Sequence, residues 1–296
     1  MYKRILIGLL LSCSACTTAH KNPVATITQQ KILQDVTWLA SDEMQGRHYR
    51  SLEAKKAARY IADAWKRAGL TPLPSKTSMY LPTDDMRDAP NVACMHKGTG
   101  DSFVLITAHY DHLKPRRSGK DRIYNGADDN ASGTAALLAI ANALAQLEHP
   151  LQSSIVLVAF TGEEAGLVGS EYFANNSPIP LRKIRGLFNL DMISRGDANT
   201  IFLEGAPDAP RINLAIQKAN KKIGLNIIRN AHTDWLSRGD QAPFIDRGVP
   251  SVFLSVEDHE DYHRVSDHTD KIIPELAAKT AQLTFLAAIE LAYPVP

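Results

Sequence analysis

The feature of this sequence that most constrains its fold is a set of short apolar runs without polar–apolar alternation. A strand with one face in water alternates apolar and polar residues, whereas a strand buried on both faces is a continuous apolar run. Helix-like segments separate several of these runs, an order typical of a parallel sheet covered by helices. The runs that we interpret as strands are residues 90–98, 102–112, 153–160, 184–194 and 248–256.

Helical patterns occupy the segments between and after these runs. Residues 52–72 repeat apolar side chains at helical spacing and end in a glycine and a proline, which stop a helix. Further helices are expected over 131–150, 166–177 and 273–292. The chain has 296 residues, of which 44% are hydrophobic, enough to bury the core of one large domain. We therefore predict a single α/β domain with a mixed, mostly parallel central sheet sandwiched between helices.

The first residues differ in character from the rest of the chain. A basic start, the apolar run ILIGLLL and a group of small residues with cysteine are typical of a secretory signal. We assign residues 1–19 to this leader and 20–296 to the folded domain. The segment LLSC resembles the lipobox of bacterial lipoproteins, which predicts acylation at Cys13 and export to the periplasm or outer membrane of a bacterium. Acylation at Cys16 and simple cleavage near Ala19 are the alternatives.

Charge, hydropathy and cysteine content restrict the partners of the domain. The formal net charge of +1 gives no indication of a nucleic-acid partner. No stretch after the leader is long and apolar enough to span a bilayer, so we expect membrane contact only through the lipid anchor. Cys94 is the one cysteine outside the leader, so a disulfide framework is excluded and Cys94 is expected to pack in a strand.

Acidic and histidine side chains follow the expected strands, at the points where the strands end. Open α/β sheets place their sites beyond the carboxyl ends of parallel strands, so we expect these side chains to lie close together. Imidazoles and carboxylates without thiolates suit Zn²⁺, or a pair of metal ions that share a carboxylate. The set comprises His109, Asp111, Asp128, Asp129, Glu163, Glu164, Asp191 and His263.

Two pairs of residues in this set have a spacing that indicates their roles at a metal site. Glu163 and Glu164 are adjacent carboxylates after a buried run, and such a pair usually needs a cation or a shared proton. Asp111 lies two residues after His109, on the same face of an extended segment, where it can orient the imidazole.

The blocks HYDH, NGADDNASG, AFTGEEAGLVGS, NLDMI and DYHRVSDHTDKI follow one another in this order, after the lead-in LASDEMQGR. Together they resemble the zinc aminopeptidase family M28 over nearly the whole chain after the leader. The resemblance implies a zinc peptidase domain over 20–296 that uses two Zn²⁺ ions to hydrolyse N-terminal residues from peptides with a free N-terminus.

The same resemblance implies five metal ligands. His109 and Asp191 would hold one ion, Glu164 and His263 the other, and Asp129 would bridge them. The family also implies a cis peptide bond between Asp129 and Asn130. Asp128 is the alternative bridging residue.

Three further roles follow from the family pattern. Glu163 would be the general base, and Tyr262 would polarise the substrate carbonyl, with simple packing as the alternative for the tyrosine. Asp240 lies where many members have a Ser-Asp-His run, but Gly239 and Gln241 depart from that run. Asp240 is therefore expected only as a supporting acid behind the ligands.

Four other interpretations compete with this one. HEDYH at 259–263 matches the zincin motif H-E-x-x-H, which needs a helix, but this segment is acidic and has no apolar stripe. We therefore expect His259 in a loop, and His112 and His268 at the surface or behind the ligands. An M20 deacylase or carboxypeptidase would need a dimerisation domain in the roughly 70 residues between Asp191 and His263. A glutaminyl cyclase usually lacks the DNASG ending, and a protein without catalytic activity would have lost a ligand or the base.

Overall fold

The computed structural model describes residues 22–85 and 87–293. The predicted leader, with Cys13, lies outside the described residues. Among the described residues, no helix is long and apolar enough to cross a membrane.

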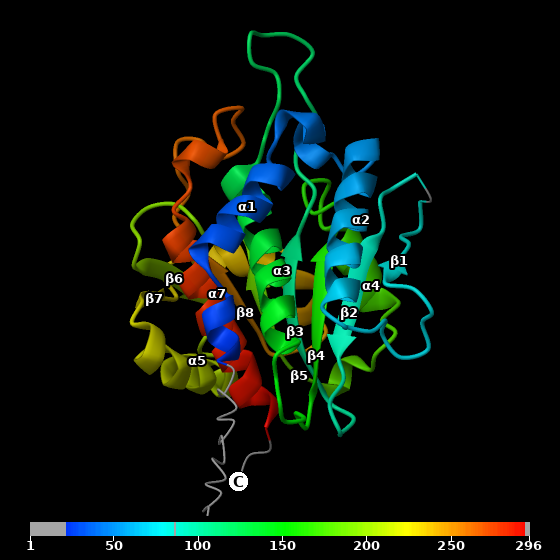
Figure 1. The fold of residues 1–296 in the computed structure, drawn as a ribbon, viewed down its shortest axis with the longest axis vertical. Helices are drawn as coiled ribbons and strands as arrows, with labels where there is room; N and C mark the ends of the chain where they lie inside the picture. The colour runs from blue at the N-terminus through cyan, green and yellow to red at the C-terminus, as the bar shows by residue number, and fades with distance from the viewer. Residues whose placement is uncertain (1–21, 86, 294–296) are drawn as a thin grey trace, which may run out of the picture.

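A single mixed sheet of eight strands forms the centre of the molecule, in the order β1-β2-β4-β3-β5-β8-β6-β7 (Figure 1). The four central strands β4, β3, β5 and β8 run parallel to one another, and β6 runs parallel to β7. Antiparallel pairings join β1 to β2, β2 to β4 and β6 to β8. The strands are β1 (Tyr80–Leu81), β2 (Asn91–His96), β3 (Phe103–His109), β4 (Ser154–Phe160), β5 (Ile184–Leu190), β6 (Thr200–Glu204), β7 (Asn226–Arg229) and β8 (Ser251–Ser255).

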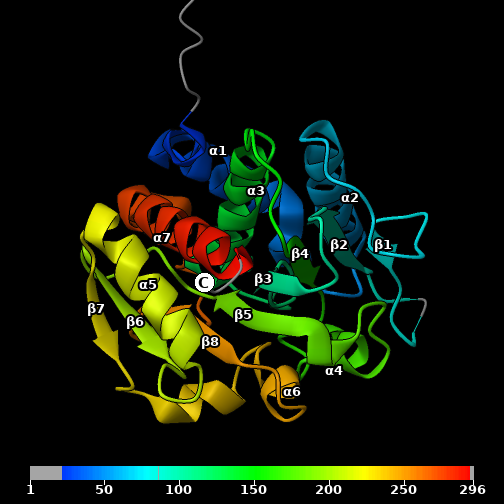
Figure 2. The ribbon, with the colours of Figure 1, turned by 90° about the horizontal axis from the view of Figure 1, so that it is seen from below.

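Helices cover both faces of this sheet, as Figure 2 shows along its edge. One face carries α1 (Gln29–Leu39), α2 (Leu52–Arg67), α3 (Gly133–Leu144), α5 (Pro210–Ile223) and α7 (Pro274–Ala292). The other face carries the shorter helices α4 (Val168–Asn175) and α6 (Ala242–Ile245). The predicted mixed, mostly parallel sheet between helices is thereby confirmed.

The apolar runs of the central strands supply two separate cores. In β3, Val104 and Ile106 pack with the five-helix face, whereas Phe103 and Leu105 pack with the opposite face. Residues of β4 divide in the same way. Because each strand buries both sets of side chains, its sequence shows no alternation.

The segment between Asp191 and His263 builds the far side of this same sheet. It forms β6, α5, β7, α6 and β8, whose strands join the central sheet and whose helices cover its two faces. No separate dimerisation domain of the M20 kind is present in this segment, which the structure describes completely.

Candidate metal centre

Four loops at one edge of the sheet bring the predicted side chains together. His109 is the last residue of β3, Asp191 directly follows β5, and Glu163 and Glu164 follow β4 within four residues. These three strands are parallel, so their carboxyl ends meet at the same edge. His263 reaches the same place from turns after β8.

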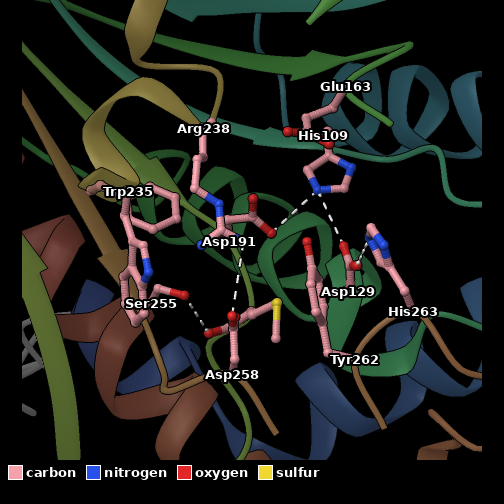
Figure 3. A pocket seen from close by; sticks show the side chains of 13 residues that line it. His109, Asp129, Glu163, Asp191, Trp235, Arg238, Ser255, Asp258, Tyr262 and His263 are labelled. Atoms are coloured by element: carbon pink, nitrogen blue, oxygen red, sulfur yellow. Dashed lines mark hydrogen bonds and ion pairs between the residues drawn. The ribbon is translucent and has the colours of Figure 1, made fainter. Parts of the chain in front are cut away.

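Two imidazoles face opposite oxygens of Asp129, as Figure 3 shows. His109 Nε2 lies 3.4 Å from Asp129 Oδ1 and 3.2 Å from Asp191 Oδ1. His263 Nε2 lies 3.3 Å from Asp129 Oδ2 and 3.0 Å from Glu164 Oε2. Zinc–ligand bonds of about 2.0–2.2 Å in tetrahedral geometry separate two ligand atoms by about 3.3 Å. The spacing of both groups therefore suits zinc.

Asp129 is the carboxylate shared by the two groups. Its Oδ2 is buried without a hydrogen-bond partner among the described residues, which suits an atom that binds a cation. The donor set of imidazoles and carboxylates is also the one that zinc accepts. Asp128, the alternative bridge, is turned away, because its Oδ1 accepts hydrogen bonds from Ser194 and its Oδ2 lies 3.2 Å from His259 Nε2.

Asp267 and Asn130, which the sequence did not mark as site residues, make hydrogen bonds that hold the segment carrying Asp129 in place. The Asp267 Oδ2 atom accepts hydrogen bonds from the backbone N–H groups of Asp128 and Asp129, at 3.0 and 3.1 Å. Asn130 Nδ2 donates to the Leu190 carbonyl at 2.9 Å, which ties this segment to the end of β5. The Asp129–Asn130 peptide bond is cis, as expected from the family pattern. Asp267 was not predicted, because nothing marks one loop aspartate among many in the sequence.

Asp111 orients His109, chiefly through its main chain. His109 Nδ1 lies 3.1 Å from the Asp111 carbonyl oxygen and 3.7 Å from Asp111 Oδ1. A proton on Nδ1, donated to that carbonyl, leaves Nε2 free to face Asp129 and Asp191. The Asp111 carboxylate serves a second purpose, because its Oδ1 accepts the backbone N–H of Glu163 at 3.2 Å.

Glu163 and Glu164 point into different surroundings. Glu163, His109 and Asp191 line one pocket, which Figure 3 shows. Burial raises the pKa of Glu163 well above the ordinary value. For Glu164, burial and the charge of Asp129 raise the pKa, but the adjacent imidazoles more than offset them and hold it below the ordinary value. One carboxylate thus favours holding a proton and the other favours remaining ionised.

Beside the carboxylates and imidazoles, the pocket is lined by the apolar side chains of Met192, Trp235 and Phe253 and by the charged side chains of Arg238 and Asp258. Tyr262 lines the same pocket, and its ring stacks on that of His263 with centroids 4.0 Å apart. Burial raises the pKa of Tyr262, so its hydroxyl stays a hydrogen-bond donor. Asp240 is buried beside this pocket rather than among its lining residues, and burial raises its pKa to about 7.

The other histidines fall partly where the sequence indicated. His259 lies in a non-helical segment, so the zincin interpretation is excluded by the local structure. His268 is about two-fifths exposed and pairs with Asp121 at the surface. His112, expected at the surface or behind the ligands, is fully buried with Nδ1 2.5 Å from Glu164 Oε1. His112 thus occupies the second of the two places expected for it, behind Glu164. The sequence could not decide between the two, because a loop after a strand has no periodicity that gives the direction of a side chain.

A buried arginine holds the loop between β3 and α3, which lies between His109 and Asp129. Arg47 is fully buried, and its guanidinium donates to the carbonyls of Leu39, Tyr110, Asn125 and Gly126 at 2.5–3.0 Å. Tyr110 lies between His109 and Asp111, and Gly126 begins the turn that leads to Asp129. Arg47 therefore holds the two ends of the loop between β3 and α3, next to His109 and Asp129, against the end of α1.

Comparison with known proteins identifies relatives of this chain. Residues 91–288 match the model of peptidase family M28. A "Probable zinc metalloprotease" of Pyrenophora teres f. teres is 28% identical over 234 residues, covering 68% of this chain and 46% of its own length. The chain spans about half the length of the curated relatives that it matches.

Solved structures share the fold. The LapA aminopeptidase of Legionella pneumophila superposes with a TM-score of 0.77 at 20% identity, covering 93% of this chain and 74% of LapA. A glutaminyl cyclase of Porphyromonas gingivalis superposes with a TM-score of 0.70 at 18% identity, covering 88% and 97%. The family match covers most of the chain, including every residue of the candidate metal centre. This chain belongs to peptidase family M28.

Proposed function

We propose that this protein is an exported aminopeptidase that uses two zinc ions and the general base Glu163 to release N-terminal residues from peptides. The observation that carries the proposal is the division of Asp129 between two imidazoles, with one oxygen facing His109 and the other facing His263. A shared carboxylate flanked by two N/O donor groups suits two ions. LapA, a protein of the same fold, is named as an aminopeptidase.

The side chains divide the work of peptide hydrolysis. His109 and Asp191 would hold one ion, Glu164 and His263 the other, and Asp129 both. Bound zinc supplies a Lewis acid for the scissile carbonyl and makes a water molecule more acidic. Glu163 accepts a proton from the attacking water and donates it to the leaving amine, a task suited to a carboxylate with a raised pKa. The Tyr262 hydroxyl donates a hydrogen bond to the carbonyl oxygen as negative charge develops on it.

The pocket lining indicates a class of substrate. Met192, Trp235 and Phe253 line the pocket that also contains Glu163, and the charged lining residues Arg238 and Asp258 lie 3.8 Å from each other as an ion pair. The side chain of the released residue would therefore lie against the apolar part of this lining. Burial of apolar surface is favourable by about 25 cal/mol per Å², and an unpaired charge there is costly. We therefore propose peptides with a free α-amine and an apolar first residue as substrates.

Substitution of the two glutamates tests the mechanism. Glu163→Gln keeps the shape of the side chain but cannot accept a proton, so kcat should fall by about two to four orders of magnitude while about two zinc ions remain bound. Glu164→Gln should instead weaken zinc binding on the His263 side. Glu290→Gln, at an exposed ion pair on α7, is the matched control and should change neither quantity.

Peptide assays on the same samples test the reaction class. Near-normal turnover by Glu163→Gln with its zinc intact would refute the role of Glu163 as the base. Faster reaction with N-acetylated peptides would replace the aminopeptidase assignment by a deacylase. Conversion of an N-terminal glutamine to a pyroglutamyl residue, with release of ammonia and no cleavage of the peptide bond, would replace it by a glutaminyl cyclase, an activity named for a protein of this fold.

A further inference from the structure

His112 is a third imidazole at the Glu164 side of the centre, and the ligand pattern of the family gives it no role. Its side chain is fully buried, whereas that of His263 is 39% exposed. His112, Asp129 and Glu164 are close enough for one ligand atom from each to share a cation. His112 could therefore have either of two roles: it binds the ion itself, or it forms a hydrogen bond to the ligand Glu164.

Distances separate these two roles. His263 Nε2 lies 3.0 Å from Glu164 Oε2, near the spacing of about 3.3 Å between two ligand atoms on one tetrahedral zinc. His112 Nδ1 lies only 2.5 Å from Glu164 Oε1, which is too close for two ligands of one ion but suits a hydrogen bond to a carboxylate. The two oxygens of Glu164 thus have different partners.

The tautomer of His112 agrees with a donor role. Its Nε2 is buried and has no hydrogen-bond partner among the described residues, whereas Nδ1 has Glu164 Oε1 as an acceptor. A hydrogen on Nδ1 has Glu164 Oε1 as its acceptor, whereas a hydrogen on Nε2 would have no acceptor among the described residues.

The surroundings of His112 hold its ring in this direction. A Cβ atom on Gly126 would come within 2.5 Å of His112 Cδ2, so the backbone of Gly126 is in direct contact with the ring. Gly126 also has a φ of 58°, a conformation that favours glycine. The ring of Tyr124 meets His112 edge-on at a centroid distance of 6.3 Å.

We propose that His112 is a positioning residue for the zinc ligand Glu164. Its Nδ1–H donates to Glu164 Oε1 and thereby directs Oε2, the oxygen shared with His263, toward the ion. Partners that fix a metal ligand in this way contribute about 10- to 100-fold to metal affinity. This inference rests on the proposed function only in that Glu164 binds the ion.

Two substitutions of His112 separate hydrogen-bond donation from packing. His112→Phe fills the same space without a donor, whereas His112→Asn places an amide N–H near the position of Nδ1. Zinc is titrated into the metal-free full chain against a chromophoric chelator, in an Asp191→Asn background that leaves the Glu164 side with its ligands. His149→Phe, in an exposed loop, is the control.

We expect His112→Phe to weaken zinc binding at the Glu164 side about 10- to 100-fold and His112→Asn to restore most of that loss. In a Glu164→Ala chain, His112→Phe should have no further effect, because the acceptor is gone. Unchanged affinity in His112→Phe, or an equal loss in His112→Asn, would overturn the proposal. Thermal unfolding of the metal-free variants verifies that each one is folded.

The readout separates this inference from the proposed function. Zinc affinity is measured without substrate, so a chain that fails to cleave peptides can still show the dependence on His112. Conversely, a chain that cleaves peptides but binds zinc equally with phenylalanine at position 112 would refute the role of His112 alone.

Discussion

Replacement of Arg47 by methionine tests whether the loops of the metal centre depend on a single buried side chain. Methionine keeps most of the apolar volume but removes the donors to four carbonyl groups. Within the described residues, the Gly126 carbonyl also accepts the Ala131 N–H at 3.2 Å, whereas the other three carbonyls receive their hydrogen bond from Arg47.

The size of the effect follows from these carbonyls. A buried acceptor left without a donor costs about 1–3 kcal/mol, and removal of a buried charge returns part of that cost. We expect Arg47→Met to lower the free energy of unfolding by about 3–5 kcal/mol. Arg47→Lys keeps the charge and some of the hydrogen bonds, so its loss should be smaller.

Urea unfolding followed by circular dichroism measures this loss, and the zinc content of the folded protein is measured in parallel. The matched control is Arg59→Met on the exposed face of α2, which should change stability by no more than about 0.5 kcal/mol. A loss below about 1 kcal/mol for Arg47→Met with zinc content unchanged would refute the reasoning, because the carbonyls would then find other donors at little cost.

Three more predictions follow from the structure and the sequence. Removal of metal by a chelator should abolish activity. It should also lower the melting temperature, because Asp129, Glu164 and Asp191 then repel one another. Calorimetry with and without added zinc measures this shift. Cys94 is buried and burial raises its pKa well above the ordinary value, so alkylation at pH 8 followed by peptide mass spectrometry should find it unmodified in the folded chain and modified after unfolding. Mass spectrometry of the mature protein should find an acylated amino terminus at Cys13, and an unmodified terminus near His20 would contradict the lipid anchor.

Strands and helices with strong patterns could be predicted from the sequence. The runs that become β3, β4 and β5 are buried throughout or nearly so, and neither β3 nor β4 contains a glycine or a proline. The edge strand β7 was not predicted, because it has only four residues, none of them fully buried. Helix α1, which buries Ile32, Asp35, Val36 and Leu39, was also missed.

The location of the candidate metal centre could be predicted from the topology of the sheet. Parallel strands bring their carboxyl ends together, so His109, Glu164 and Asp191 had to lie near one another. Residues that act through hydrogen bonds to loops could not be found in this way. Arg47 is a charged residue in a polar segment, where exposure is the ordinary expectation, and only the fold reveals the carbonyls that converge on it.

Helix α7 completes the core with the last described residues of the chain. It packs on α1, α3 and α5 and on β3, and the Ala292 carbonyl accepts the backbone N–H of Ser153 at 3.0 Å. During synthesis, β3, α1 and α3 leave the ribosome before α7, so the five-helix face of the sheet stays open until α7 has been made. The residues that precede Pro274 therefore cannot close this core on their own, and a stable fold has to wait for the helix that covers it.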